Sequence, residues 1–431
     1  MNLTFEQKLD NFAEVSLRVG VGLQAGQRLL IVSSPENTPL VHKIVKRAYG
    51  LGARLVEVLW DDEIINLIRL QHAPLDSLDE PARVLSMVLN DLAEKGDAIL
   101  WFRSKDPALF KEIEAEKVGL YQTVLMKSRA PYFKKVTTNG INWCLMGPPI
   151  ASWAKRILPH LSEKDALETM WDAVFKVIRA DVEDPVGAWT RHNEVLRQTR
   201  EYLNAKQYAA LKLRGGGTDL TIGLPKQHIW GGGAHRVTQG EQQGLVFTAN
   251  LPTEEVWTLP HRDQVNGVAK ASKPLSYAGV LITDIEVEFK EGRIVSAKAS
   301  QGEETLQKLI ATDDGAHHLG EIALVPHSSP VSQTQLLFCD TLYDENAASH
   351  IAIGSAYRNN LEGGVAMTDE AFRAAGGNIS LVHVDWMIGH DKMDVWGIKE
   401  DGTEEPIMVQ GEWAFSVDTF GSQSPVTTSS H

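Results

Sequence analysis

Cysteine is nearly absent from this sequence. Only Cys144 and Cys339 occur among its 431 residues, and they form no CxxC pair. A disulfide framework or a cysteine-rich structural zinc site is therefore excluded, and a reducing cytoplasm fits the composition. Long apolar runs are missing too: no stretch reaches the roughly 18 apolar residues that span a bilayer, and the N-terminus has alternating charges instead of the apolar core of a signal peptide. We expect a cytoplasmic protein without a membrane partner.

Positive charge is also in short supply. The chain has 42 lysine and arginine residues against 56 aspartate and glutamate residues, a formal net charge of −14. A field of this sign repels phosphate backbones, so we expect no nucleic-acid partner. Two familiar motifs are missing as well. Residues 33–39, after the first expected strand, hold no GxGxxG, which argues against a dinucleotide cofactor, and the single-zinc protease motif HExxH occurs nowhere.

Strand and helix patterns alternate through the first half of the chain. Residues 28–33 have the apolar character of a buried strand, residues 38–53 have the spacing of an amphipathic helix, and residues 54–62 follow as a second strand. The pattern continues with helices around 80–94 and 109–126 and strands at 97–103 and 141–149. A β-α-β order requires parallel strands with right-handed crossovers. We therefore expect a doubly wound, mainly parallel α/β domain.

The second half has the patterns of β-hairpins. A charged helical segment, 162–207, leads into one hairpin that turns at Gly215–Gly217 and a later one that turns at Glu291-Gly292. A second glycine run, 231–233, also suggests a hairpin turn, with phosphate binding as the less favoured alternative. We therefore divide the chain into an N-terminal α/β domain, 1–207, and a C-terminal mixed α/β domain with antiparallel hairpins, 208–431.

Two segments of the second half combine imidazoles with carboxylates. The sequence HVD places His383 and Asp385 two residues apart in an apolar run, so on a strand both side chains project from one face, roughly 7 Å apart at the backbone. The sequence DENAASH places Glu345 five residues before His350, followed by small apolar positions. Both pairs suit a borderline metal such as zinc. Two alternatives stay open: a core histidine satisfied by an acid for the first pair, and a helix N-terminal cap for Glu345.

Three upstream acids extend this set. Glu254 and Glu255 are neighbours, so on an extended chain only one can face a site, and a cap or a solvated pair is the alternative. Glu321 precedes an apolar strand, where active-site groups are often held, although a surface acid would give the same pattern. His317 and His318 would lie within one helical turn of Glu321. Since HHLGE is not a zinc-protease motif, we treat these two as flanking residues.

The charge of this set indicates two metal ions. One catalytic zinc takes about three protein ligands and a water, whereas the set offers four carboxylates and two imidazoles: Glu255, Glu321, Glu345, Asp385, His350 and His383. Four negative charges balance two divalent cations, and such a pair shares a bridging carboxylate and activates a water. Tyr357 lies two helical turns after His350 and would share its face on a helix, although alone it would pass as a core aromatic.

Four blocks, in this order and spacing, resemble one family. They are NLPTEEVWTLPHRDQVNG, LGEIALVP, DTLYDENAASHIAIG and SLVHVDWMIG. With RVGVGLQAGQRLLIV and AYGLGARLVEVLWDD in the first half, they closely resemble the aminopeptidase T and aminopeptidase S family of metallopeptidases over nearly the whole chain. The resemblance implies a homodimeric two-metal aminopeptidase that releases N-terminal residues from peptides. Zinc or cobalt is the expected metal, with manganese or magnesium as alternatives.

Carried over residue by residue, the resemblance assigns metal ligation to Glu255, Glu321, Glu345, His350, His383 and Asp385. It also places an oxyanion-stabilising hydroxyl at Tyr357. Glu254 or Glu321 would carry the proton to the leaving amine, and the sequence does not choose between them. Ser349 stands where the family commonly has cysteine, which removes no ligand. Two rival functions stay open: a non-enzymatic small-ligand-binding protein with a structural metal, and a two-metal hydrolase of another bond.

Overall fold

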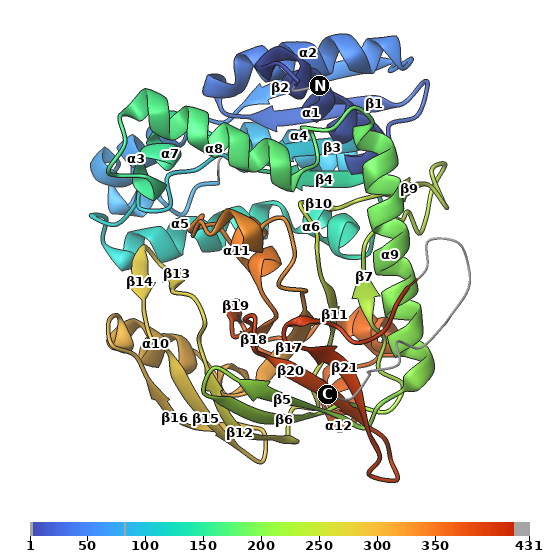
Figure 1. The fold of residues 1–431 in the computed structure, drawn as a ribbon. Coiled ribbons are helices and arrows are strands. Elements are labelled where there is room, and N and C mark those ends of the chain that lie inside the picture. Colours follow the sequence, from blue (N-terminus) through green and yellow to red (C-terminus); the bar gives the residue numbers. More distant parts are fainter. Residues whose placement is uncertain (1–2, 82, 418–431) are drawn as a thin grey trace. The chain divides into compact units, whose positions relative to one another are not determined.

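Two units make up the chain in the computed structural model, which describes residues 3–81 and 83–417 (Figure 1). The first unit comprises Met1–Arg191 and Ala234–Pro252, and the second comprises His192–Gly233 and Thr253–His431. The division falls within helix α9 (Pro185–Lys206). The expected boundary at residue 207 concerns domains that fold independently, and it stays a prediction.

The first unit contains a five-stranded parallel sheet in the order β10-β4-β3-β1-β2. Its strands are β1 (Arg28–Ser33), β2 (Leu55–Trp60), β3 (Ala98–Phe102), β4 (Trp143–Met146) and β10 (Asn250–Leu251). The four strands expected in the first half are confirmed. β1 lies inside the sheet and is buried from Leu29 to Ser33, whereas the residues of the edge strand β2 are exposed or half-buried, as expected for central and edge strands of a parallel sheet.

Helices cover both faces of this sheet, so it is doubly wound as predicted. Ile99 of β3 clusters with Leu89 of α4, whereas Phe102, three residues on and thus on the opposite face, meets Phe12 of α1 edge to face. The helix predicted from residue 109 begins only at Ala115, because successive turns occupy the residues before it. The helices are α1 (Phe5–Val15), α2 (Thr38–Gly50), α3 (Glu63–His72), α4 (Arg83–Lys95), α5 (Ala115–Ser128), α6 (Ala130–Thr137), α7 (Ala151–Ile157) and α8 (Glu163–Val177).

Two main antiparallel sheets and one short two-stranded sheet lie in the described part of the second unit. The larger has the order β16-β15-β12-β6-β5-β20-β21-β22 and the smaller the order β19-β18-β17-β11-β7. The larger contains β5 (Ala210–Gly215), β6 (Thr218–Gly223), β12 (Val265–Lys270), β15 (Glu286–Lys290), β16 (Arg293–Lys298), β20 (Asp394–Ile398), β21 (Glu404–Val409) and β22 (Glu412–Trp413). The smaller contains β7 (Gly231–Gly232), β11 (Val256–Thr258), β17 (Leu319–Leu324), β18 (His350–Gly354) and β19 (His383–Met387).

Both long hairpins expected in the second half are confirmed. β5 and β6 turn at the first glycine run, and β15 and β16 turn at Glu291-Gly292. The remaining short elements of the unit are β13 (Leu275–Tyr277), β14 (Val280–Ile282), α10 (Glu303–Ile310), α11 (Thr341–Asp344) and α12 (Asp369–Ala374). In the first unit, β8 (His235–Arg236) pairs with β9 (Val246–Phe247).

The turn expected at residues 231–233 is wrong. Gly231 and Gly232 form strand β7 and pair with Trp257 and Val256 of β11. A Cβ at Gly231 would lie 2.8 Å from the Trp257 ring, and a Cβ at Gly232 would lie 2.8 Å from the Val256 side chain. Close packing of the two strands, and not a turn, therefore explains the glycines.

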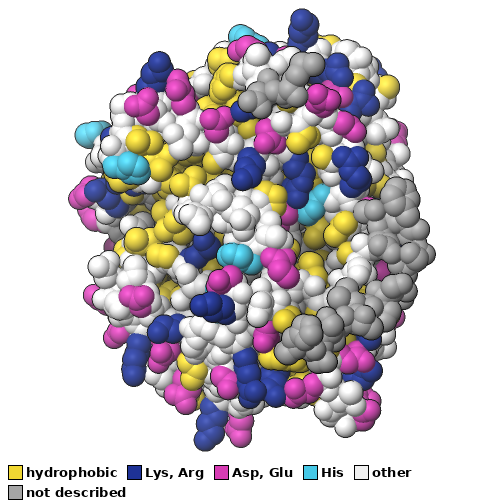
Figure 2. Space-filling view, in the orientation of Figure 1, with side chains coloured by type: hydrophobic (Ala, Val, Ile, Leu, Met, Phe, Trp, Pro, Cys, Tyr) yellow, Lys and Arg dark blue, Asp and Glu magenta, His cyan; other side chains and the backbone are white. Residues whose placement is uncertain are grey.

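The surface carries charges of both signs. On the face drawn in Figure 2, basic and acidic side chains are interspersed, with hydrophobic side chains between them. Within residues 3–81 and 83–417, no helix combines the length and the apolar character that crossing a membrane requires.

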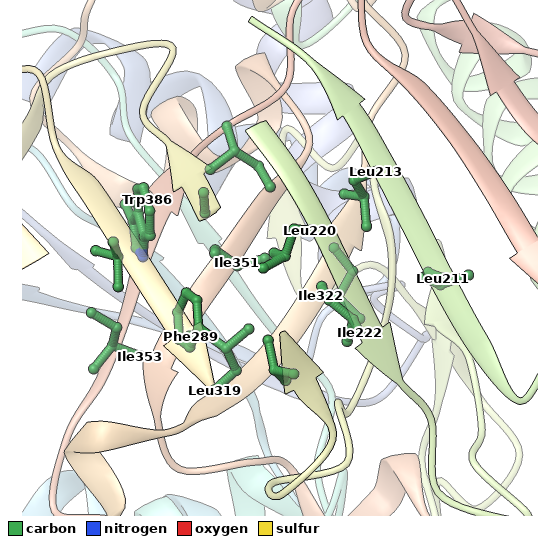
Figure 3. Close-up of a cluster of buried hydrophobic side chains, with 14 of the residues drawn as sticks. Leu211, Leu213, Leu220, Ile222, Phe289, Leu319, Ile322, Ile351, Ile353 and Trp386 are labelled. Carbon is green, nitrogen blue, oxygen red and sulfur yellow. The ribbon is translucent and has the colours of Figure 1, made fainter. Parts of the chain in front are cut away.

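The core of the second unit lies between its two sheets (Figure 3). On β18, Ile351 and Ile353 point into this core, so His350 faces the other way. On β19, Trp386 points into the core, so Asp385 faces the other way. The smaller sheet thus has one face committed to packing and one face available for a site.

A β-bulge at Gly320 turns Glu321 toward this second face. The pairing of β17 with β18 shifts by one residue between Leu319 and Glu321. Leu319 and Ile322 both belong to the core, and strict alternation from Leu319 would send Glu321 into that core as well. The extra residue removes the conflict, which is a common use of bulges beside functional sites. A Cβ at position 320 would lie 2.3 Å from the Ser355 carbonyl oxygen, so the bulge needs glycine.

Gly320→Ala should destabilise the protein by roughly 1–3 kcal/mol, because its methyl group would overlap backbone oxygens. Denaturant unfolding measures this change. Gly50→Ala at the end of α2 is the matched control, since no atom lies within 4 Å of its Cβ position, and it should leave the free energy of unfolding within about 1 kcal/mol of the wild type. Equal effects of the two substitutions would contradict the proposed role of the bulge.

Candidate metal centre

Three neighbouring strands present acids and imidazoles on the second face of the smaller sheet. Glu321 comes from β17, His350 from β18, and His383 and Asp385 from β19. The strand register explains why they meet: Ala352 pairs with Glu321 on one side and with Asp385 on the other. This small residue leaves the space above the central strand to the two carboxylates. The prediction that His383 and Asp385 share one face of a strand is confirmed.

These side chains, with Glu255 just before β11, form two overlapping triads. In the first triad, His350 Nε2 lies 3.1 Å from Glu255 Oε2 and 3.6 Å from Glu321 Oε1. In the second triad, His383 Nε2 lies 3.7 Å from Glu321 Oε2 and 3.4 Å from Asp385 Oδ1. Each triad offers three potential ligand atoms within 4.8 Å of one another. Glu321 belongs to both triads and turns one oxygen toward each.

Backbone carbonyls determine the tautomer of both histidines. His350 Nδ1 lies 3.0 Å from the carbonyl oxygen of Ala348, and His383 Nδ1 lies 2.7 Å from that of Ser355. A carbonyl can only accept a hydrogen bond, so each Nδ1 carries a hydrogen and donates it. When the ring is neutral, Nε2 then turns its lone pair toward the carboxylates. Metal-binding histidines are commonly oriented in this way.

While the imidazole rings are neutral, two carboxylate oxygens of the triads lack hydrogen-bond donors. Among the residues that the structure describes, Glu255 Oε2 and Asp385 Oδ1 have no hydrogen-bond partner although both atoms are buried. Buried carboxylates repel the imidazole lone pairs that they face, unless positive charge lies between the two groups. Divalent cations would satisfy these oxygens and nitrogens together, so the donor set fits such ions.

Protonation equilibria reflect the same need for positive charge. Burial raises the pKa of Glu321 to about 7. Burial opposes a charge on His383, but Asp385 and Glu321 outweigh it and raise the pKa of His383 to about 10. Burial likewise opposes a charge on His350, and Glu255 and Glu321 outweigh it and raise the pKa of His350 well above its ordinary value. Metal binding at these groups must therefore release protons.

Glu345 lies beside the triads, but it is not a helix N-terminal cap. The cap of α11 is Asp340, whose side chain accepts a hydrogen bond from a backbone amide of the first turn. The N-cap alternative for Glu345 is wrong, because it requires a helix to begin after Glu345, whereas α11 ends at Asp344, just before it. Burial, together with the charges of Glu255 and Asp385, raises the pKa of Glu345 well above its ordinary value. Its carboxylate is therefore among the other acids of the centre.

Tyr357 borders the second triad. Its ring centroid lies 4.8 Å from that of His383. Although the residue as a whole is 49% exposed, partial burial, together with the charges of Glu321 and Asp385, raises the pKa of Tyr357 well above its ordinary value, so the hydroxyl keeps its proton at neutral pH. The prediction that Tyr357 and His350 share one face of a helix is wrong, because His350 begins a strand and Tyr357 follows in the loop beyond it.

Glu254 is buried beside helix α9, next to its neighbour in the first triad. Its Oε2 lies 3.3 Å from His192 Nε2, and its backbone N–H donates to Asn346 Oδ1 over 2.6 Å. The two adjacent acids of the TEE block thus have different surroundings: Glu255 contacts His350 in the first triad, and Glu254 adjoins the imidazole of α9.

The remaining candidates from the sequence are Glu321, which lies in both triads, and His317 and His318, which lie in neither. Glu321 lies within β17 and is only 5% exposed, so the surface-acid alternative is wrong. His318 Nδ1 lies 2.9 Å from the Arg262 carbonyl oxygen, and Arg262 Nη2 lies 3.1 Å from His318 Nε2. Neither His317 nor His318 belongs to a triad, which agrees with their treatment as flanking residues.

Three supporting residues were not found by sequence reasoning: His192, Asn346 and Asp344. The Asp344 carboxylate accepts hydrogen bonds from the backbone amides of Phe338 and Asp340, at 2.8 and 3.1 Å, and so holds the loop before α11. Asp344 and Asn346 flank the candidate ligand in DENA, so attention to that segment could have found them. His192 carries no local signal, because its pairing with the TEE block is purely tertiary.

Comparisons with known proteins extend over almost the entire chain. The family model described as thermophilic metalloprotease (M29) matches residues 5–413. Aminopeptidase T of Thermus thermophilus is 42% identical over 409 residues, 95% of this chain and 99% of that protein. Aminopeptidase 2 of Geobacillus stearothermophilus is 40% identical over 413 residues, 96% and 99% of the two chains. A solved structure of wild-type AmpT from Thermus thermophilus is similar at a TM-score of 0.89 and 41% identity, and covers 95% of this chain and 100% of that chain.

Asp344 should make a pH-dependent contribution to stability. Burial raises its pKa from 3.8 to about 7, so the folded state keeps a proton that the unfolded state releases. This contribution is complete below about pH 4 and is lost as the pH rises toward 7, by up to about 4 kcal/mol. Asp344→Asn cannot titrate, so its stability should fall less over this range. Thermal unfolding of both proteins between pH 4 and 7 measures the difference, and parallel curves would contradict it.

Proposed function

We propose that this chain, which belongs to the M29 family of metalloproteases and is a metallo-aminopeptidase, releases N-terminal residues at a centre of two divalent cations. The observation that carries this proposal is Glu321, which belongs to both triads and turns one oxygen toward each. Two triads with one shared carboxylate suit two cations better than one. The proposed ligands are Glu255, Glu321, Glu345, His350, His383 and Asp385.

Zinc or cobalt is the metal that we propose, because imidazole and carboxylate donors suit both ions. Manganese and magnesium are the alternatives, since oxygen donors dominate the set. When bound, such ions polarise the scissile carbonyl and lower the pKa of a water to about 7.

The Tyr357 hydroxyl is the proposed donor to the oxyanion. Its raised pKa keeps the proton in place at neutral pH, and its ring adjoins His383. A protonated donor at this border can stabilise the charge that develops on the carbonyl oxygen during attack.

Glu254 is the proposed carrier of the proton to the leaving amine, with Glu321 as the alternative. Ligation would occupy both oxygens of Glu321, whereas Glu254 belongs to neither triad. Glu254 is buried and adjoins His192. A buried carboxylate beside an imidazole can accept a proton from the attacking water and deliver it to the amine.

The substrates are peptides, and we propose that they need a free N-terminus. We also propose a cytoplasmic homodimer. Neither Cys144 nor Cys339 forms a disulfide, which supports a reducing compartment, and the homodimer rests on the family resemblance alone. Light scattering after gel filtration measures the oligomeric state.

Amino-acid release from unblocked peptides, with zinc, cobalt, manganese or magnesium added in turn, tests the proposed function. N-acetylated versions of the same peptides are the matched control and should resist cleavage. p-Nitrophenyl phosphate tests the rival two-metal hydrolase of another bond. Equal cleavage of the acetylated peptides, or full release after exhaustive chelation, would contradict the proposal.

Glu321→Gln should reduce the bound metal from about two ions to fewer than one per chain, because it removes charge from both triads. His383→Ala changes one triad and should retain about one ion. Elemental analysis measures both, and the rise in Tm on metal addition should shrink in parallel. Glu304→Gln, at a side chain that is 83% exposed, is the control and should bind as the wild type does. Two ions bound to Glu321→Gln would refute the shared-ligand assignment.

Tyr357→Phe should lower kcat about 100-fold or more while the metal content stays unchanged, because only a donor to the oxyanion is lost. Steady-state kinetics with elemental analysis separates these quantities. Tyr49→Phe on α2, at a residue of similar exposure, is the matched control and should keep full activity. Loss of metal from Tyr357→Phe would show that the hydroxyl has another role.

A further inference from the structure

One peptide bond beside the candidate metal centre is held at both of its polar ends. This bond joins Thr253 to Glu254, and its carbonyl oxygen lies 2.7 Å from His192 Nε2. Its N–H donates to Asn346 Oδ1 over 2.6 Å. His192 comes from helix α9 and Asn346 from the 3-10 turn just after α11, so two elements distant in sequence fix the plane of one peptide.

The carbonyl oxygen determines which nitrogen of His192 carries a hydrogen. A carbonyl only accepts hydrogen bonds, so Nε2 of His192 carries a hydrogen and donates it to Thr253. The same nitrogen lies 3.3 Å from Glu254 Oε2. One N–H therefore faces two neighbouring acceptors, and it attracts the carboxylate of Glu254 toward helix α9.

The carboxylate of Glu254 depends on such a donor because it is buried. The residue is only 3% exposed, and a buried carboxylate loses hydration that polar partners must replace. A glutamate side chain can adopt several rotamers, and the N–H of His192 favours those that keep Oε2 beside α9. The neighbouring acid, Glu255, contacts His350 instead, so the two acids keep separate orientations.

We propose that His192 is a positioning residue for peptide cleavage: its Nε2–H holds the Glu254 carboxylate in the orientation that proton transfer requires. The inference rests on the function proposed above, in which Glu254 takes a proton from the attacking water and delivers it to the leaving amine. His192 belongs to neither triad. It acts through Glu254 and exchanges no proton with the substrate. Such positioning matters because a displacement of about 1 Å can lower the rate about 100-fold.

Removal of the N–H tests this role. His192→Leu should lower kcat roughly 10- to 100-fold while KM stays within about twofold of the wild-type value, because only the orientation of the proton carrier changes. The bound metal should stay at about two ions per chain, since Asn346 still holds the N–H end of the peptide. Steady-state kinetics, elemental analysis and thermal unfolding measure these quantities.

Two amide replacements of different reach separate the donor from the ring. The amide nitrogen of His192→Gln can take the place of Nε2, whereas that of His192→Asn lies closer to the backbone. Glutamine should therefore keep kcat within about threefold of the wild type, and asparagine should lower kcat as leucine does. His42→Leu is the matched control, because His42 is also a helical histidine but is exposed on α2, and it should leave kcat unchanged.

Coupling to Glu254 distinguishes a positioning role from a purely structural one. The side chain in Glu254→Gln cannot carry the proton, so its orientation no longer affects the rate. Adding His192→Leu to Glu254→Gln should therefore change kcat by less than about twofold. An equal fold-loss of kcat in the wild-type and Glu254→Gln backgrounds would overturn the proposal, because it would mean that His192 acts without Glu254.

The outcomes separate this proposal from the function on which it rests. Full activity of Glu254→Gln, or wild-type protein that releases no amino acid from unblocked peptides, would overturn the roles of Glu254 and His192 together. A large loss in Glu254→Gln beside a wild-type kcat in His192→Leu would overturn the positioning role alone, as would loss of bound metal from His192→Leu. If His192→Leu does not fold, the two amide variants decide: a higher kcat with glutamine than with asparagine supports the proposal, and an equal or lower one contradicts it.

Discussion

Carboxylates gathered in one buried space are the constraint on which the second unit depends. Glu321 approaches both imidazoles, Glu255 and Asp385 approach one each, and Glu345 adds a fourth acid. Buried like charges repel and lose hydration, so the arrangement is stable only when positive charge accompanies it. Proton uptake by the histidines meets this need in one way and divalent cations in another. Carbonyl acceptors at Nδ1 are compatible with both, because they stabilise the protonated ring and, in the neutral ring, leave Nε2 as a ligand atom.

The antiparallel sheet meets this constraint with ordinary strand geometry. Alternation sends Ile351 and Trp386 into the core and leaves the residues beside them for the centre. Strand β17 departs from strict alternation, because the bulge at Gly320 prevents Glu321 from entering the apolar core. The same alternation along β19 brings His383 and Asp385 to one face, beside the other acids of the centre. Packing and chemistry thus use opposite faces of the same strands.

Sequence patterns predicted the elements whose burial is periodic. β1 and the hairpins at Gly215–Gly217 and at Glu291-Gly292 follow from apolar runs and turn residues. The patterns failed between Glu345 and His350, because a helix end, a 3-10 turn and a strand start share that short interval. No single period describes such a segment, so the expected N-cap and the expected helical face of Tyr357 were both wrong.

The sequence by itself supplied the candidate residues of the centre: acids and imidazoles in numbers that suit two cations, and one pair, His383 and Asp385, that strand alternation places on a common face. Those inferences are local or additive, since they need only strand alternation and a sum of charges. The tertiary structure alone decided that Glu321 lies in both triads and that Glu254 adjoins His192. Such contacts depend on the register and packing of strands distant in sequence, which no local pattern encodes.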